Sequence, residues 1–249
     1  MTGQMTDTDL QEIARIADQV EAHLRSRDSV EGAITWHSAS KTDVGKVRPI
    51  NEDAFLDSEE QRLWAVADGM GGHSRGDFAS SAVVKELRTF LPQGLLLASL
   101  QDLEGRLQAA NDRCRTAFRK HRPGTTVVAM LAHGGYCFFL WAGDSRAYRL
   151  RDGELVQLTK DHTLAHNAHA LTRAVGIREN LQLDLCYTPV QHGDRFLLCS
   201  DGLYNPVEFS QICSSLSQGS PEEACNSLVN LALEGGGRDN ITVVTVDAS

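Results

Sequence analysis

The sequence lacks any apolar run of about 18 residues, the length that a membrane-spanning helix needs, and its N-terminus lacks the basic-then-apolar pattern of a signal peptide. We therefore expect a cytoplasmic protein with no membrane insertion. Basic residues are also scarce, with 24 Lys and Arg against 33 Asp and Glu and a formal net charge of −9. No basic or aromatic stripe is present, which disfavours nucleic acid as a partner and a two-metal nuclease as the activity.

The six cysteines contain no C-x-x-C pair, and most of them lie inside apolar runs. This distribution predicts reduced, packed thiols in a reducing compartment rather than a disulfide framework.

The chain of 249 residues is long enough to bury a sizeable core. Apolar residues three to four apart over residues 8–25 predict an amphipathic helix, and a polar linker follows it. We expect the segment 1–32 either to pack on the main domain or to contact a partner, and residues 33–249 to form that domain.

From residue 33 onward, short β-like runs alternate with helical stretches. The turn signals at 133–135 and 151–153 predict hairpins, and strands joined by tight turns must be antiparallel. These patterns predict an α+β fold in which two antiparallel sheets pack together and helices cover both outer faces. The expected strands are 34–38, 54–56, 63–67, 125–132, 136–142, 147–150, 155–158, 195–199 and 241–246, and the expected helices are 76–91, 100–120, 206–216 and 221–233.

Acidic residues gather at the ends of these strands. The apolar run 63–67 ends at Asp68, and Gly69 follows it, so that a carboxylate and an accessible carbonyl could seat a hard divalent cation. Other carboxylates in the same setting are Glu52, Asp53, Asp144, Asp201 and Asp239. They would repel one another if they converged without cations between them.

The acidic residues belong to a series of longer motifs, which are, in chain order, Thr42–Asp53, Asp68–His73, Gly124–Thr126, Gly143–Tyr148, Leu158–His162, Leu171–Gly176, Ser200–Leu203 and Arg238–Thr242. In this order, the motifs resemble those of the metal-dependent serine/threonine protein phosphatases of type 2C. The resemblance covers residues 36–247.

The resemblance implies two Mn²⁺ or Mg²⁺ ions, with a third, weaker ion at Asp144. Asp68 would bridge the two metals, and Asp201 and Asp239 would complete the first ion. The Gly69 carbonyl would reach the second ion, with Glu52 or Asp53 bound directly or through water. Arg48 matches the phosphate-binding arginine of the family, although it could instead neutralise Glu52 and Asp53. Arg48, Asp68 and Asp239 are the expected catalytic residues.

The implied activity is hydrolysis of phosphoserine and phosphothreonine in proteins by a water that bridges the two ions. We expect a monomer that opposes a bacterial Ser/Thr protein kinase. The alternative is a catalytically weak regulatory module that binds phosphoproteins on the same fold.

The sequence departs from the family pattern in two places. Met70 stands where some members carry a histidine, and His73 is expected to have a packing or turn role. The flap after Asp161-His162 is shortened to residues 163–170. His162, His166 and His169 would share one face of a helix and could then bind zinc, but the family motif already accounts for His162.

Overall fold

The structure is a computed structural model that describes residues 34–70, 75–118, 123–164 and 167–249, together with Arg15 and Asp18. The helix predicted over residues 8–25 lies outside the described residues apart from Arg15 and Asp18, which are both helical.

Two antiparallel sheets form the centre of the molecule. One has the strand order β1-β13-β12-β7-β8, and the other has the order β11-β6-β5-β3-β2 with β4 paired to β3. The bounds are β1 Trp36–Asp43, β2 Asp53–Ser58, β3 Leu63–Met70, β4 Gly124–Thr125, β5 Val127–His133, β6 Tyr136–Ala142, β7 Arg146–Arg151, β8 Glu154–Gln157, β11 Asp184–Pro189, β12 Arg195–Cys199 and β13 Ile241–Ala248. The predicted hairpins are confirmed, since β5 pairs with β6 and β7 with β8, each antiparallel.

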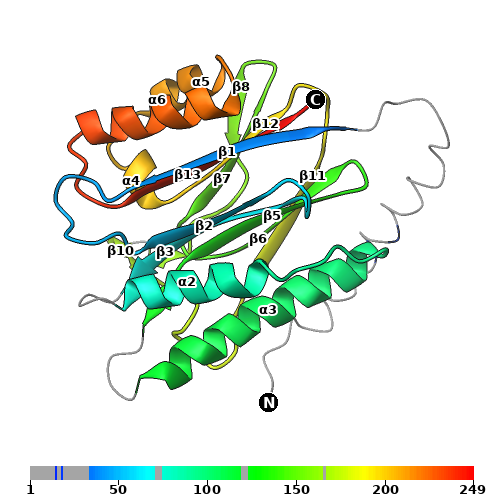
Figure 1. The fold of residues 1–249 in the computed structure, drawn as a ribbon, viewed down its shortest axis with the longest axis vertical. Helices are drawn as coiled ribbons and strands as arrows, with labels where there is room; N and C mark the ends of the chain where they lie inside the picture. The colour runs from blue at the N-terminus through cyan, green and yellow to red at the C-terminus, as the bar shows by residue number, and fades with distance from the viewer. Residues whose placement is uncertain (1–14, 16–17, 19–33, 71–74, 119–122, 165–166) are drawn as a thin grey trace.

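Helices cover the outer face of each sheet, so four layers are visible in Figure 1. Three apolar clusters fill the spaces between them: one under α2 and α3, one under α5 and α6, and one between the two sheets. Alternating side chains of one strand serve different layers, because Ala65 packs toward α2 and α3 whereas Trp64 and Val66 pack between the sheets. The predicted α+β sandwich is confirmed.

Helix boundaries differ from the predictions where capping groups decide them. The helices are α2 Gly76–Leu87, α3 Leu96–Ala117, α4 Asp201–Tyr204, α5 Phe209–Leu216 and α6 Pro221–Glu234. The helix predicted from residue 206 starts at Phe209, because Glu208 and Gln211 form a capping box there. The prediction that this helix continues to residue 91 is wrong, because α2 ends at Leu87 and Arg88 is its C-cap.

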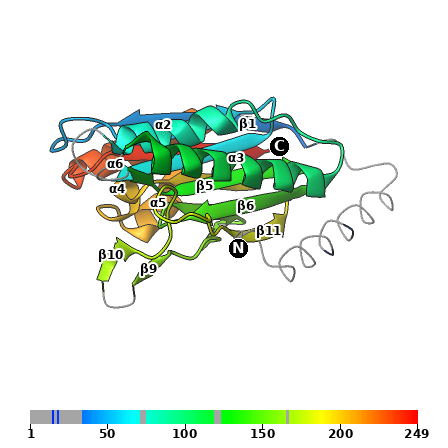
Figure 2. The same cartoon turned by 90° about the horizontal axis from the view of Figure 1, so that it is seen from below.

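The described residues that follow His162 are extended and not helical. Strands β9 (Thr163–Leu164) and β10 (Asn167–Leu171) pair antiparallel, and Figure 2 shows them extending beyond the two sheets. The helical spacing therefore does not apply to His162 and His169, and His166 lies outside the described residues.

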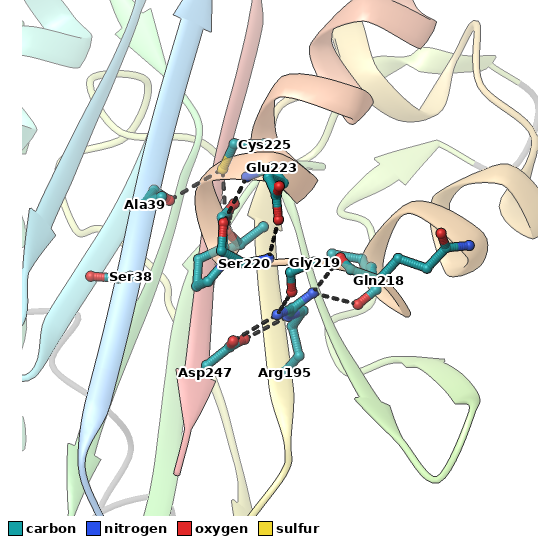
Figure 3. Close-up of polar contacts among 12 residues, drawn as sticks. Ser38, Ala39, Arg195, Gln218, Gly219, Ser220, Glu223, Cys225 and Asp247 are labelled. Carbon is teal, nitrogen blue, oxygen red and sulfur yellow. Dashed lines mark hydrogen bonds and ion pairs between the residues drawn. The ribbon is translucent and has the colours of Figure 1, made fainter.

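An arginine whose N–H groups are all hydrogen-bonded fixes the loop between α5 and α6 to the sheet that contains β12 and β13 (Figure 3). Arg195 on β12 donates from Nε and Nη2 to the carboxylate of Asp247 on β13, at 2.5 and 2.7 Å. Its remaining hydrogen bonds go to three carbonyls of that loop, those of Leu216, Gln218 and Gly219. Ser220 and Glu223 then cap α6 reciprocally, so the loop and the helix start are held together.

All six cysteines are free thiols, as expected. Across the part of the chain that the structure describes, no helix is both long and apolar enough to span a membrane.

Candidate metal centre and active site

Strand pairing brings the first two acidic residues together. Asp53 at the start of β2 stands opposite Asp68 near the end of β3 in the antiparallel register. Side chains that are directly opposite have their Cβ atoms about 5 Å apart, and like charges in that position destabilise a sheet. The Asp68 peptide is held in place by Thr126, which accepts from the Asp68 nitrogen at 3.0 Å and donates its own backbone N–H to the Asp68 carbonyl at 2.9 Å.

The sheet that contains β12 and β13 supplies two more carboxylates. Asp201 is the first residue of α4, directly after β12, and Asp239 lies two residues before β13. The backbone passes so close at this point that a Cβ on Gly202 would stand 1.9 Å from the Asn240 carbonyl oxygen. Only glycine permits that approach, which sets α4 against the start of β13.

One pocket of about 440 Å³ collects these groups between the ends of the two sheets. Of the predicted site residues, all except Asp53 line it: Arg48, Glu52, Asp68, Gly69, Asp144, Asp201 and Asp239. Asp53 is not among the residues that line the pocket. Its Oδ2 accepts a hydrogen bond from the Ser200 hydroxyl at 2.8 Å, and its Oδ1 is buried with no hydrogen-bond partner.

Burial and mutual repulsion raise the pKa values of three of these carboxyl groups. Burial, opposed by hydrogen bonds and reinforced by Asp201 and Asp239, raises the pKa of Asp53 to about 7. Burial, followed by the charges of its acidic neighbours, raises the pKa of Asp68 well above its usual value. Burial and then Asp201 raise the pKa of Asp144 to about 6. The site therefore concentrates negative charge that a proton or a cation must offset.

The carboxylates turn toward protein donors in this arrangement. Glu52 Oε1 accepts from the Gly76 nitrogen at 3.0 Å, and Asp201 Oδ2 accepts from the Asn205 amide at 3.0 Å. Within the described residues, no three His, Cys, Asp or Glu side chains are grouped closely enough to hold a metal ion as they stand. The unpartnered Asp53 Oδ1 fits a cation as its missing partner, as does the all-oxygen donor set. The individual ligands remain predictions.

Arg48 enters the pocket from the loop between β1 and β2. Its Nη2 donates to Asp239 Oδ2 at 2.7 Å, and this hydrogen bond is the main reason why the pKa of Arg48 is raised. The alternative in which Arg48 chiefly neutralises Glu52 and Asp53 is therefore not what the structure shows. Asn240 anchors the loop, because its Nδ2 donates to the carbonyls of Val44 and Ile50, both at 2.9 Å.

A second arginine, Arg173, also lines the pocket. Arg173 Nη1 donates to Asp184 Oδ1, and Asp184 Oδ2 lies 3.1 Å from His162 Nε2. Because His162 Nδ1 accepts from the Gly143 nitrogen at 3.2 Å, the neutral ring carries its proton on Nε2 and donates it to Asp184. Burial alone would raise the pKa of Asp184. The hydrogen bonds from His162 and Arg173 outweigh burial and hold this pKa below its usual value.

Several lining residues were not predicted from the sequence. The motifs 124–126 and 171–176 were noted without a role for their side chains, and nothing in the sequence marked Ile177. The unpredicted lining residues are Thr126, Leu171, Thr172, Arg173, Ala174 and Ile177.

Comparison with known proteins gives consistent results. The family model described as Protein phosphatase 2C matches residues 46–230. The serine/threonine protein phosphatase PstP of Mycobacterium tuberculosis is 36% identical over 232 residues, which cover 84% of this chain and 44% of that protein. This chain thus spans less than half the length of that relative.

Two solved structures extend the likeness to three dimensions. PppA, described as a key regulatory component of T6SS in Pseudomonas aeruginosa, has 42% identity and a TM-score of 0.82, covering 86% of this chain and 98% of that one. The catalytic domain of PstP in complex with two manganese ions has 37% identity and a TM-score of 0.79, covering 87% and 99%.

Proposed function

The chain belongs to the protein phosphatase 2C family, and on that premise we propose that it hydrolyses phosphoserine and phosphothreonine esters in proteins with the help of two divalent cations, Mn²⁺ or Mg²⁺. The observation that carries the proposal is the single pocket in which Arg48 faces four aspartates and a glutamate from both sheets. The two manganese ions in the PstP complex support the choice of metal.

The residues have distinct roles in this proposal. Asp53, Asp68, Asp201 and Asp239 hold the cations with Glu52 and the Gly69 carbonyl, and Asp144 offers a further, weaker position. When bound, the cations supply a water of lowered pKa and offset the charge of the phosphoryl group. Arg48 grips two phosphate oxygens with its planar guanidinium.

The proton for the leaving alkoxide comes from solvent in this scheme. Met70 cannot donate a proton, and no histidine is present among the described residues that line the pocket.

The partners we propose are a phosphoprotein substrate and the Ser/Thr protein kinase that phosphorylates it. PppA, which is 42% identical to this chain, is described as a key regulatory component, and this supports a regulatory role in general. Phosphoproteomics of a deletion strain tests it, since sites that gain phosphate would identify the substrate and its kinase.

The biochemical test is hydrolysis of p-nitrophenyl phosphate with Mn²⁺ and after chelation by EDTA. We expect a Mn²⁺-dependent rate that Asp68→Ala and Asp239→Ala each lower by about a thousandfold or more. Asp152→Asn is the matched control, because Asp152 is exposed at the β7–β8 turn, outside the pocket. A native chain with no metal-dependent rate would instead support the regulatory phosphoprotein-binding module.

A further inference from the structure

The pocket has an apolar side as well as an acidic one. Met70, Leu171, Ala174 and Ile177 line the same cavity as Arg48 and the carboxylates. Ile177 and Met70 adjoin each other there, since Ile177 Cδ1 and Met70 Cγ lie 3.0 and 3.4 Å from the place that a Cβ on Gly124 would occupy. The volume of about 440 Å³ falls in the range of pockets for drug-sized ligands. It is therefore larger than one phosphate group requires.

Ile177 is exposed although its backbone is tightly fixed. Its side chain is among the exposed large hydrophobic groups, at 50%. On its N-terminal side, the Gly176 nitrogen donates to Asn111 Oδ1 on α3 at 2.7 Å, and Val175 forms a β-bridge with Thr125. On its C-terminal side, Asn111 Nδ2 donates to the Arg178 carbonyl at 3.0 Å. A fixed backbone thus presents an apolar side chain to solvent at the pocket, which favours an apolar occupant.

Charge on this side of the pocket is balanced. Arg173 lines the wall beside Ile177, but its guanidinium is paired with Asp184, which also accepts from His162. An acidic residue of a substrate would have to compete with Asp184 for Arg173, and a basic one would find Asp184 already paired with Arg173 and His162. A neutral apolar side chain meets neither cost.

We infer that Ile177 and Met70 form a specificity surface for an apolar residue next to the phosphorylated residue of the substrate. With the phosphate at Arg48, a neighbouring leucine-like side chain packs on Ile177 and removes its exposed half from water. This inference rests on the proposed function and names the class of phosphoprotein segment that the pocket accepts.

The test uses two phosphothreonine peptides that differ only in the residues on either side of the phosphothreonine. One peptide has leucine at both positions, and the other has asparagine at both. Asparagine matches leucine in size and carries no charge, so apolar character alone is varied. We expect the native chain with Mn²⁺ to show kcat/KM about tenfold higher for the leucine peptide. In Ile177→Ser, the ratio of kcat/KM for the leucine peptide to kcat/KM for the asparagine peptide should fall to about twofold or less. In Ile177→Leu, this ratio should stay near tenfold, or about the native value.

Leu91→Ser serves as the matched control, because Leu91 is an apolar residue with 66% exposure that does not line the pocket. It should leave the ratio between the two peptides unchanged. Equal kcat/KM values for the two peptides, in a native chain that hydrolyses p-nitrophenyl phosphate with Mn²⁺, would overturn this inference alone. A native chain that hydrolyses neither p-nitrophenyl phosphate nor any peptide would overturn the inference together with the proposed function.

Discussion

Arg48 Nη2 and Asp239 Oδ2 lie 2.7 Å apart, although 191 positions separate the two residues in the chain. Arg48 is the expected phosphate ligand and Asp239 an expected metal ligand, so the ion pair joins two groups that would hold different parts of the reacting complex. The side chains are 49% and 37% exposed, and solvent screening limits such a pair to about 1 kcal/mol at most. A cation at Asp239 can therefore displace the guanidinium at little cost.

Arg48→Ala is expected to separate metal binding from phosphate binding. Removing the guanidinium removes both a competitor and a positive charge near Asp239, so Mn²⁺ should bind up to about fivefold more tightly in calorimetric titrations. The KM for phosphopeptides should rise in the same variant, because the bidentate phosphate contact is lost. Arg88→Ala, at an exposed site after α2, is the control. Weaker Mn²⁺ binding in Arg48→Ala would show that the ion pair helps to build the site.

Stability without metal should fall as pH rises. Asp53 and Asp144 have folded-state pKa values of about 7 and about 6, above their usual value of 3.8, so the native state binds more protons than the unfolded state in this window. The free energy of unfolding of the EDTA-treated protein therefore declines from about pH 4 to about pH 7. Bound Mn²⁺ offsets the repulsion, and at 100 times its Kd it adds about 2.7 kcal/mol.

Thermal melts at several pH values, with EDTA and with Mn²⁺, measure this effect. The gap in Tm between the two conditions should widen from pH 5.5 to pH 8 and reach about 5–10 °C. Asp53→Asn removes one charge of the cluster, and it should raise the metal-free Tm at pH 8 while shrinking the shift caused by Mn²⁺. A gap that stays constant with pH would contradict the role of these carboxylates.

The acidic side of the pocket could be predicted from the sequence because its signals are local. Asp68-Gly69 and Asp201-Gly202 each follow an apolar run in the sequence, which predicts carboxylates at strand ends, and the resemblance to the type 2C phosphatases implied that they share one site. The pairing of Arg48 with Asp239 has no local signal, since it arises only when the loop after β1 meets the residues before β13.

The apolar side could not be predicted for a similar reason. Ile177 stands between Ala174-Val175-Gly176 and the polar Arg178-Glu179-Asn180, a sequence with no strand or helix period, and its exposure at the pocket depends on Asn111 from the distant α3. Strand β11 was missed because it lies at the edge of its sheet, where one face is partly exposed and no continuous apolar run is required. The β9–β10 hairpin is too short for its period to be read.

Asn240→Ala is expected to impair phosphate binding from a distance. Asn240 is 5% exposed, and its side chain holds both ends of the Arg48 loop and accepts from the Glu52 nitrogen at 2.8 Å. The loss of these hydrogen bonds should lower the free energy of unfolding by about 2–3 kcal/mol. It should also raise the KM for phosphopeptides more than it lowers kcat. Asn226→Ala, which loses one bond from Lys41, is the control and should leave KM unchanged.

Arg195→Met should destabilise the fold without touching the pocket. The side chains of Arg195 and Asp247 are 11% and 24% exposed, so methionine leaves a largely buried carboxylate and three loop carbonyls without their donor. We expect the free energy of unfolding in urea to fall by about 2–4 kcal/mol, with kcat/KM for p-nitrophenyl phosphate retained at temperatures where the protein stays folded. Arg113→Ala breaks an ion pair with Glu86 whose arginine is 53% exposed, and it should cost less than about 1 kcal/mol. Equal losses in the two variants would mean that Arg195 does no more than an exposed ion pair, and that the loop before α6 is held by the Ser220–Glu223 cap instead.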